Sequence, residues 1–336
     1  MRAAVTVAHG DVSNISIRSD YPDPDPANDE VIVKVAATAV NYHDVLTRRG
    51  MPGIKSPLPV VVGSDVAGVV EKLGSHVSGW EVGKRVLIDP IFRDGVRVGL
   101  LGETADGGRA EFVAVPAAQL LPVPEEVSLD KAAALPLAYG TAHRMLCAQG
   151  RLAKGERILI LGASGGVGVA CVQLATLLGA EVIACASSDD KLTRLRRLGA
   201  VHGINYSQQS IAESVNRIAG KPRLNGAGGV DVAVNFTGGD TWIDTQRCVR
   251  LGGRILTCGA TAGFRVEMDM RFLWTFEHQM IGSNGWSRDD LVKLLEMLAV
   301  RRLDPEIDAI LPLQDSARAE LLLEQRQVFG KLLLKP

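Results

Sequence analysis

A buried strand, a glycine-rich turn and an apolar helix follow one another within residues 157–186, and this unit constrains the fold most. The apolar run 157–161 leads into Gly-Ala-Ser-Gly-Gly-Val-Gly at 162–168. An apolar helix then extends to Leu178, and a second apolar strand occupies 181–186. About 30 residues of strand, helix and strand are typical of one crossover in a parallel sheet. The pattern predicts an α/β domain.

The turn has the spacing of a dinucleotide-binding motif, G-x-G-x-x-G, with alanine at the first position. Small residues let the backbone approach a pyrophosphate, whose charge is stabilised by N–H groups and by the positive end of the helix. The alternative is a tight strand-to-helix turn that binds nothing. We predict that the turn binds a cofactor through five residues: Ala163, Gly165, Gly166, Val167 and Gly168.

The end of the second strand favours NADPH over NADH. NAD sites usually carry Asp or Glu about 20 residues after the glycines, but Ala186 stands there, followed by Ser187 and Ser188. A carboxylate at that position would repel the 2′-phosphate of NADPH. Lys191 and Tyr206 are further candidates for contacting this phosphate. Alternatively, the serines only cap the next helix and the lysine is solvated.

The chain is long enough, at 336 residues, for two domains with separate cores. Its first 120 residues read as short extended runs between Pro, Gly and Asp, and predict a β-rich domain. From about Asp130, helices alternate with apolar strands, beginning with a helix expected over 129–149. In the last segment, from 307 to 336, we expect a charged helix and then a strand at 328–334.

Several motifs together resemble the medium-chain dehydrogenase/reductase superfamily along essentially the whole chain. Besides the glycine turn, they are residues 40–45, 62–70, 106–112, 140–142 and 329–331. The resemblance implies a GroES-like catalytic domain at 1–120, completed by 285–336, and a Rossmann dinucleotide-binding domain at 121–284. It places the active site in a cleft between them.

Zinc members of that superfamily carry ligands at positions where this chain does not. They place Cys where this chain has Asn41, His-Glu where it has Ser64-Asp65, and Cys near Leu137. A zinc site needs three or four N, S or O ligands. The chain therefore resembles the zinc-independent branch, which includes quinone oxidoreductases and NADPH-dependent alkene reductases, and we expect no metal.

The loss of a metal restricts the substrate. A metal supplies several kcal/mol of charge stabilisation to a carbonyl, whereas a quinone or enone spreads the charge of an incoming hydride over its own conjugated system. We expect NADPH-dependent reduction of a small-molecule quinone or α,β-unsaturated carbonyl. The alternatives are a zinc-free alcohol or sugar dehydrogenase, and an NADPH-binding protein with little turnover.

Three neighbouring residues are the catalytic candidates. His43 is the first candidate for a proton donor, since an ordinary pKa near 6.5 permits that role. Tyr42 is the second, and Asn41 is a candidate for orienting the substrate or the nicotinamide ribose. The alternative for His43 is a structural hydrogen bond.

The resemblance also implies contacts to the nicotinamide end of the cofactor. These are expected from Thr141, Thr237, Cys258, Gly259, Ala260, Ser283, Asn284, Gly330 and Lys331. The loops 51–59 and 91–102 are expected to shape the substrate pocket. A homodimer is the family expectation, with 271–280 near the subunit contact or, alternatively, in the core.

The charge balance excludes several other partners. Lys and Arg number 37 against 38 Asp and Glu, which gives a net charge of −1 and no field that attracts nucleic acid or a membrane. No apolar run is long enough to span a bilayer, and the first residues lack a secretory signal. Five widely spaced cysteines argue against a disulfide framework. We expect a cytoplasmic protein with neither nucleic-acid nor membrane partners.

Overall fold

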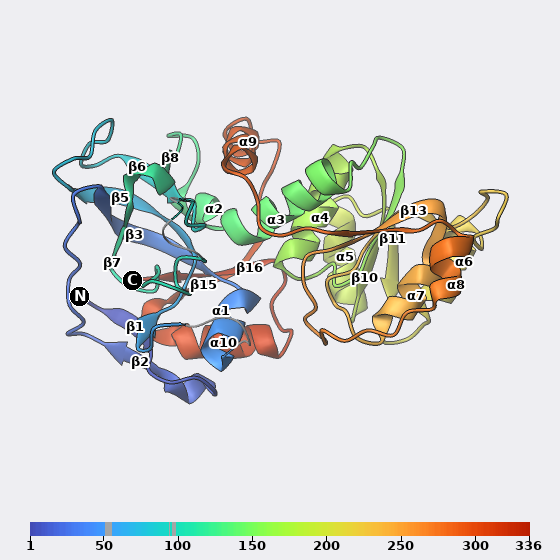
Figure 1. Cartoon of the computed structure of the whole chain (residues 1–336), viewed down its shortest axis with the longest axis horizontal. Coiled ribbons are helices and arrows are strands. Elements are labelled where there is room, and N and C mark those ends of the chain that lie inside the picture. The colour runs from blue at the N-terminus through green and yellow to red at the C-terminus, as the bar shows by residue number, and fades with distance from the viewer. Residues whose placement is uncertain (51–55, 94, 96–98) are drawn as a thin grey trace. The chain divides into compact units, whose positions relative to one another are not determined.

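The computed structural model describes the chain except for residues 51–55, 94 and 96–98. The loops expected to shape the substrate pocket, 51–59 and 91–102, thus lie partly outside the described residues. The chain divides into two compact units (Figure 1), Met1–Ala138 with Arg288–Pro336, and Tyr139–Ser287.

The first unit extends beyond residue 120 because the helix α2 (Leu129–Ala133) packs on its strands β3 (Glu30–Val40), β5 (Asp65–Leu73) and β6 (Arg85–Ile88). These strands belong to a seven-stranded sheet, ordered β15-β16-β3-β5-β6-β8, with β7 pairing on β3. The other bounds are Ile307–Pro312 (β15), Lys331–Lys335 (β16), Leu120–Pro122 (β8) and Phe112–Pro116 (β7).

Alternating apolar residues of these strands form the core of the first unit, including Val31, Val33, Val35, Val66 and Ile88. A smaller sheet holds β2 (Ile15–Arg18), β1 (Ala3–Thr6) and β4 (Val60–Val61) in that order. The helices of this unit also include α1 (Tyr42–Arg49), α9 (Arg288–Ala299) and α10 (Ser316–Glu324). The predicted β-rich domain is confirmed.

The second unit is a six-stranded parallel sheet, ordered β11-β10-β9-β12-β13-β14. Numbered from β9, this is the strand order 3-2-1-4-5-6 of the Rossmann fold, which confirms the predicted fold class. The strands are Arg157–Ile160 (β9), Glu181–Ala186 (β10), His202–Asn205 (β11), Val230–Val234 (β12), Val249–Thr257 (β13) and Gln279–Gly282 (β14).

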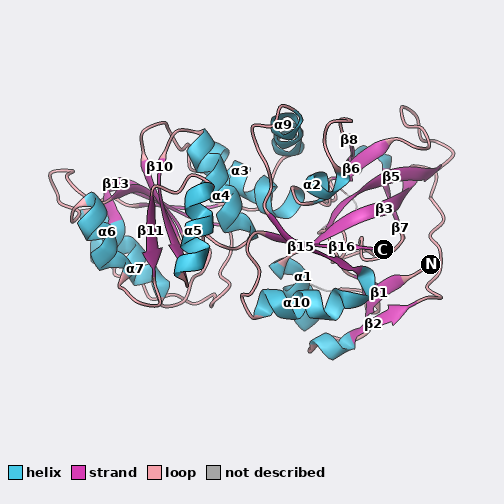
Figure 2. Ribbon diagram, turned by 180° about the vertical axis from the view of Figure 1, so that it is seen from behind, coloured by secondary structure: helices cyan, strands magenta, loops and turns pink. Residues whose placement is uncertain are grey.

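Helices cover both faces of this sheet. Figure 2 shows α4 and α5 on one side of the strands and α6 and α7 on the other. The helices are Gly166–Leu177 (α4), Asp189–Arg197 (α5), Ile211–Ala219 (α6), Thr241–Cys248 (α7) and Met270–Thr275 (α8).

Two segments differ from their predictions in part. The helix expected over 129–149 is broken into α2, α3 (Thr141–His143) and two wider π turns at 136–140 and 144–149. Pro136 has no N–H to donate and interrupts the regular ladder. In the last segment, the expected charged helix is found as α10 and the expected strand as β16. Sequence reasoning missed β15, whose alternating exposure fits a strand paired in parallel with β16.

None of the helices that the structure describes is both long and apolar enough to cross a membrane. The cytoplasmic location and the absence of nucleic-acid and membrane partners stay predictions.

Candidate active site

The glycine turn joins β9 to α4 in a tight conformation. Gly162 has a φ of +63°, which favours glycine. A Cβ on Gly168 would lie 2.3 Å from the carbonyl oxygen of Gly162 and 2.6 Å from Cα of Ala163. The first turn of α4 therefore packs directly on the end of β9, which only glycine at position 168 permits.

Gly165, in contrast, borders open space. A Cβ there would meet only the Gly162 oxygen, at 3.7 Å, and a Cβ on Gly259 or Gly282 would meet nothing within 4 Å. At the end of β14, the Ser283 hydroxyl is buried without a hydrogen-bond partner among the described residues. The open backbone, the unpaired hydroxyl and the start of α4 lie at the same end of the sheet, where the carboxyl ends of its parallel strands meet. Together they fit a pyrophosphate-containing dinucleotide.

The structure brings most predicted cofactor residues of the second unit to this carboxyl end of the sheet, because they directly follow its parallel strands. Thr237 follows β12, where its N–H donates to Oδ1 of Asn235 at 3.0 Å. Burial raises the pKa of Cys258 to about 12, so this residue is a neutral thiol. The predicted cofactor residues at the carboxyl end of the sheet are Ala163, Gly165, Gly166, Val167, Gly168, Ser187, Ser188, Thr237, Cys258, Gly259, Ala260, Ser283 and Asn284.

Lys191 and Tyr206 also lie near these carboxyl ends, just beyond β10 and β11. The remaining predicted cofactor residues lie elsewhere. Thr141 opens α3, which packs on α4. Gly330 and Lys331 belong to the first unit. A Cβ on Gly330 would lie 2.5 Å from the Glu306 oxygen, so this glycine is required by the backbone itself. Their contacts to a cofactor stay predictions.

The residues after β10 have structural roles that the sequence left open. The Ser188 hydroxyl caps α5 by accepting from the N–H of Lys191 at 3.4 Å. The carboxylate of Asp189 accepts from Nδ2 of Asn205 at 3.0 Å. Sequence reasoning missed this pair, because the two residues come from different strand ends. Tyr206, which directly follows Asn205, is 39% exposed.

A polar cluster lies at one end of the large sheet of the first unit. Lys331 begins β16, Asn41 follows β3, and Asp65 begins β5, and these three strands are neighbours. Because β3 runs antiparallel to both β16 and β5, the three residues meet at the same end. The topology therefore assembles residues that are far apart in the sequence.

Hydrogen bonds connect this cluster internally. The Lys331 ammonium contacts Oδ1 of Asn41 and lies 3.1 Å from Oδ2 of Asp65. The other carboxylate oxygen accepts from the N–H of Leu137 at 2.9 Å, and Nδ2 of Asn41 donates to Ser64 Oγ at 3.3 Å. Exposure is 4% for Asn41, 1% for Ser64, 0% for Asp65 and 2% for Lys331.

His43 lies on α1, two residues after Asn41, which is the N-cap of that helix. Its Nε2 is 3.0 Å from the Glu103 carboxylate. Burial alone lowers the pKa of His43, but the hydrogen bond to Glu103 and the charges of Glu103, Asp44 and Asp65 outweigh it and raise the pKa above 6.5. Sequence reasoning missed Glu103. Tyr42 precedes His43 on the same helix turn.

A buried ionic network connects α1 to Arg109 and to α10. Asp44 accepts from the Asn41 N–H at 2.9 Å and from Arg109 at 2.9 Å. Arg109 also contacts Glu320 of α10, which accepts from Arg48 at 2.5 Å. Burial raises the pKa of Asp44, and the Arg109 charge opposes that shift. The network holds the backbone at Asn41 and therefore the catalytic candidates that follow.

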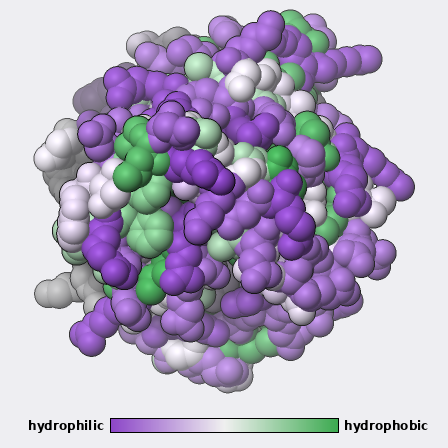
Figure 3. Space-filling model, turned by 90° about the vertical axis from the view of Figure 1, so that its right-hand side faces the viewer, coloured by the Kyte–Doolittle hydropathy of each residue, from purple (hydrophilic) through white to green (hydrophobic). Residues whose placement is uncertain are grey.

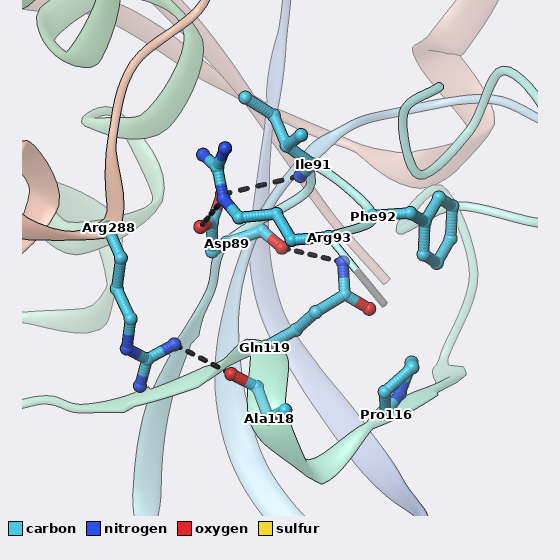
Figure 4. A pocket seen from close by; sticks show the side chains of 8 residues that line it. All are labelled: Asp89, Ile91, Phe92, Arg93, Pro116, Ala118, Gln119 and Arg288. Carbon is cyan, nitrogen blue, oxygen red and sulfur yellow. Dashed lines mark hydrogen bonds and ion pairs between the residues drawn. The ribbon is translucent and has the colours of Figure 1, made fainter. Parts of the chain in front are cut away.

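A small cavity of about 120 Å³ lies between the residues that follow β6 and those that join β7 to β8 (Figure 4). Asp89 follows β6 and pairs with Arg93 at 3.2 Å, while Gln119 donates to the Asp89 carbonyl at 2.8 Å. Ile91 and Phe92 supply apolar walls.

Zinc does not fit the cluster around Asp65. The positions that bind zinc in metal-dependent relatives do converge here. The groups they present are an amide, a hydroxyl, one carboxylate and a backbone N–H, of which only the carboxylate is an ordinary zinc ligand. Zinc sites are built from thiolate, imidazole and carboxylate ligands, and an ammonium already pairs with the carboxylate. Across the described residues, no group of three His, Cys, Asp or Glu side chains suits a metal ion.

The two folds and the glycine turn define a dinucleotide-dependent oxidoreductase. A family model described as zinc-binding dehydrogenase matches residues 166–300, and an alcohol dehydrogenase GroES-like domain model matches residues 27–125. Quinone oxidoreductase-like protein 2 of Bos taurus is 31% identical over 316 residues, which cover 91% of this chain and 84% of the relative. The chain belongs to the medium-chain dehydrogenase/reductase superfamily and is quinone oxidoreductase-like.

Solved structures agree with this assignment. A structure described as an NAD-dependent alcohol dehydrogenase has a TM-score of 0.93 and 35% identity and covers 100% of both chains. A 2-octenoyl-CoA carboxylase reductase, solved with NADP and 2-octenoyl-CoA, has a TM-score of 0.86 and 27% identity over 99% of this chain and 87% of its own. Similar folds thus occur with either dinucleotide.

Proposed function

We propose that the protein is a zinc-independent, NADPH-dependent reductase of quinones or α,β-unsaturated carbonyl compounds. The observation that carries the proposal is the cluster of Asn41, Ser64, Asp65 and Lys331, whose amide, hydroxyl and ammonium-paired carboxylate do not suit zinc. Without a Lewis acid, a conjugated acceptor that delocalises charge is the best substrate. The names of the bovine relative and of the octenoyl-CoA reductase support these two substrate classes.

In this proposal the cofactor supplies a hydride, and the chain binds, orients and protonates. The glycine turn at 162–168, with the start of α4, holds the pyrophosphate. His43, paired with Glu103, donates a proton to the reduced substrate. Asn41 is held in one orientation by Lys331 and Ser64.

A substrate panel tests the proposal. NADPH oxidation is followed at 340 nm with 1,4-benzoquinone, cyclohex-2-enone, crotonyl-CoA, cyclohexanone and a sugar aldehyde, each with and without EDTA. We expect turnover with the quinone or with the unsaturated compounds, no effect of EDTA, and no stoichiometric zinc by elemental analysis. Turnover only with cyclohexanone or the aldehyde favours a zinc-free alcohol or sugar dehydrogenase, and tight NADPH binding without any oxidation favours a binding protein.

The preference for NADPH is tested at Ala186, which ends β10 and is fully buried. Ala186→Asp is expected to weaken NADPH binding at least about tenfold relative to NADH. A carboxylate about 5 Å from a phosphate of charge near −2 is repelled by several kcal/mol before screening. Fluorescence titration of both cofactors gives the two dissociation constants.

Ala186→Asn is the matched control, since it has the size of aspartate without the charge. It should lower both affinities equally, and the unfolding midpoints of the two variants show whether the buried position tolerates them. An unchanged NADPH preference in a folded Ala186→Asp protein contradicts the placement of the 2′-phosphate.

The pairing of His43 predicts a pH effect. Glu103→Gln removes the charge that raises the pKa of His43, so this pKa is expected to fall. His43 carries its proton below its pKa, so a rate that depends on proton donation declines as the pH rises through it. In the variant this decline moves to lower pH. NMR titration of the imidazole and the pH profile of kcat/KM measure the two shifts.

The imidazole of His202, paired with Glu181 in the other unit, is the internal reference for that titration. A shift of the His43 signals without a shift of the rate profile would mean that another group donates the proton.

We also propose that the protein is a homodimer through the β14 side of the second unit. In the described sheet β14 pairs only with β13, and the nearby Phe264, Met270 and Trp274 are 65%, 49% and 65% exposed. On the face that Figure 3 shows, apolar residues lie in small groups among hydrophilic ones. Large apolar residues at a sheet edge are typical of an interface.

Trp274→Glu is expected to convert the dimer to a monomer, because it places a charge in the contact. Light scattering after size exclusion measures the mass, and Val82→Glu, at an equally exposed site of the first unit, is the control. A monomeric wild type, or a Trp274→Glu protein that stays dimeric, contradicts this interface.

A further inference from the structure

The hydrogen bonds around Asn41 have a fixed direction. A lysine ammonium donates and cannot accept, so Oδ1 of Asn41 is the acceptor of the Lys331 contact. Nδ2 of Asn41 is therefore the group that donates to Ser64 Oγ, at 3.3 Å. Since Ser64 Oγ accepts this bond, its own hydroxyl hydrogen is left for another acceptor.

No acceptor for that hydrogen lies among the residues that the structure describes. The contact with Asn41 is the one that the Ser64 hydroxyl makes there, and Ser64 is 1% exposed. Buried hydroxyls in native proteins find a partner in the protein, in ordered water or in a ligand. Ser64 itself stands at one of the positions where zinc members of the superfamily carry a metal ligand.

We propose that Lys331, Asn41 and Ser64 form a hydrogen-bond relay whose last member, the Ser64 hydroxyl, donates to the carbonyl oxygen of the substrate. The inference rests on the proposed function and deepens it, because it assigns the group that stabilises the carbonyl oxygen without a metal. Ser64 is then a catalytic residue, and Asn41 and Lys331 are positioning residues. The cation polarises the amide, and the amide polarises the hydroxyl.

The relay matches the charge that develops during reduction of an enone. A new C–H bond forms at the β-carbon as the hydride arrives. The C=C π pair shifts to join the α-carbon to the carbonyl carbon, and the C=O π pair moves onto the oxygen, which gives an enolate. That oxygen accepts the hydrogen bond from Ser64, which keeps its hydrogen. The α-carbon then takes a proton from His43, which gives the saturated carbonyl and the oxidised cofactor. Removing one donor to such an oxyanion typically costs about 100- to 1,000-fold in kcat.

Two single variants test the relay. Ser64→Ala removes the donor, and kcat with cyclohex-2-enone is expected to fall about 100-fold with little change in KM. Asn41→Asp leaves the hydroxyl in place, but the new carboxylate only accepts, so the Ser64 hydrogen turns toward it and away from the substrate. We expect the same loss of kcat in both, and no further loss in the double variant.

Independent, multiplicative losses in the double variant would overturn the relay, as would an unchanged kcat in Asn41→Asp. Folding is checked by thermal unfolding of each protein. The contribution of Lys331 is tested with Asp65→Asn present, because Lys331→Met alone leaves a buried carboxylate unpaired. We expect this paired variant to lose at least about tenfold in kcat relative to Asp65→Asn.

A spectroscopic measurement separates the relay from the proposed function. The infrared carbonyl band of cyclohex-2-enone, labelled with ¹³C at the carbonyl, is recorded on the protein with NADP⁺, and the unlabelled compound gives the difference. A hydrogen bond from Ser64 is expected to lower the band frequency in the wild type below its value in solution, and this shift is expected to disappear in Ser64→Ala and Asn41→Asp. Cyclohexanone, which has a carbonyl but no conjugated C=C bond, is the second probe.

A lowered band without turnover of any quinone or enone would leave the relay in place and reject the proposed function. A band at its solution frequency in the wild type, or an identical shift in Ser64→Ala, would overturn the relay and mean that the Ser64 hydrogen is used by water.

Discussion

Arg109→Leu is expected to lower the free energy of unfolding by about 3 to 5 kcal/mol, the cost of leaving buried charges without their partner. Arg109 is fully buried and bridges Asp44 and Glu320. Its removal leaves the Asp44 carboxylate without a cation, while Glu320 retains Arg48. Urea denaturation at neutral pH measures the loss.

The deficit should also depend on pH. Burial raises the pKa of Asp44 above its usual value, and the Arg109 charge works against that rise. In the variant the pKa of Asp44 rises further, so its protonated form is favoured in the folded state. The stability deficit is therefore largest at neutral pH and shrinks as the pH falls and Asp44 takes up a proton.

Lys72→Met is the control for Arg109→Leu. It removes an ion pair of the same kind in the same unit, but the side chains of Lys72 and Asp25 are 59% and 89% exposed. Solvent screens such a pair, so the unfolding midpoint should stay unchanged. A loss below about 1 kcal/mol for Arg109→Leu would mean that the network does not carry the stability we assign to it.

Gly165→Val is expected to weaken NADPH binding by about 100-fold, or about 2.7 kcal/mol, without changing the stability of the protein without cofactor. The backbone of Gly165 has φ −80° and ψ 175°, which valine adopts freely, and its Cβ would meet only one atom, at 3.7 Å. The valine would instead fill the space in which we place the pyrophosphate. Fluorescence titration with NADPH measures the affinity.

Gly168→Val is the contrasting variant. Its Cβ would lie 2.3 Å from the Gly162 oxygen, so the strand and helix must separate and the unfolding temperature should fall. Gly165→Ala, with a single added methyl group, should bind NADPH with intermediate affinity. Wild-type affinity in Gly165→Val would contradict the assignment of the turn as the pyrophosphate site.

The site was predictable where its residues are neighbours in the chain. The turn at 162–168 needs only one strand, one helix and the small residues between them, so its spacing indicates its geometry. The strand after it was predicted at its observed bounds, 181–186, because a continuous apolar run is typical of a buried parallel strand. Local periodicity failed at 129–149, where a proline and packing against the sheet break the helix.

The partners of the catalytic candidates could not be read from the sequence in the same way. His43 meets Glu103 across 60 residues, and Lys331 meets Asn41 across 290. No spacing rule links residues that only sheet pairing brings together. The resemblance marked Asn41, Ser64, Asp65 and Leu137 as positions that hold zinc ligands in relatives. It placed Lys331 near the nicotinamide but gave no sign that its ammonium contacts Asn41 and Asp65.

The sequence by itself thus determined the family and the strand, turn and helix around 157–178, because these depend on residue types within short motifs. The dinucleotide site at this turn and the lack of zinc ligands are predictions from the sequence. Only the tertiary structure decided that an ammonium stands among those former ligand positions and that the Ser64 hydroxyl keeps a free hydrogen. The physical reason is that a hydrogen bond depends on the position and direction of both groups. For side chains on separate strands, the register of the sheet sets both.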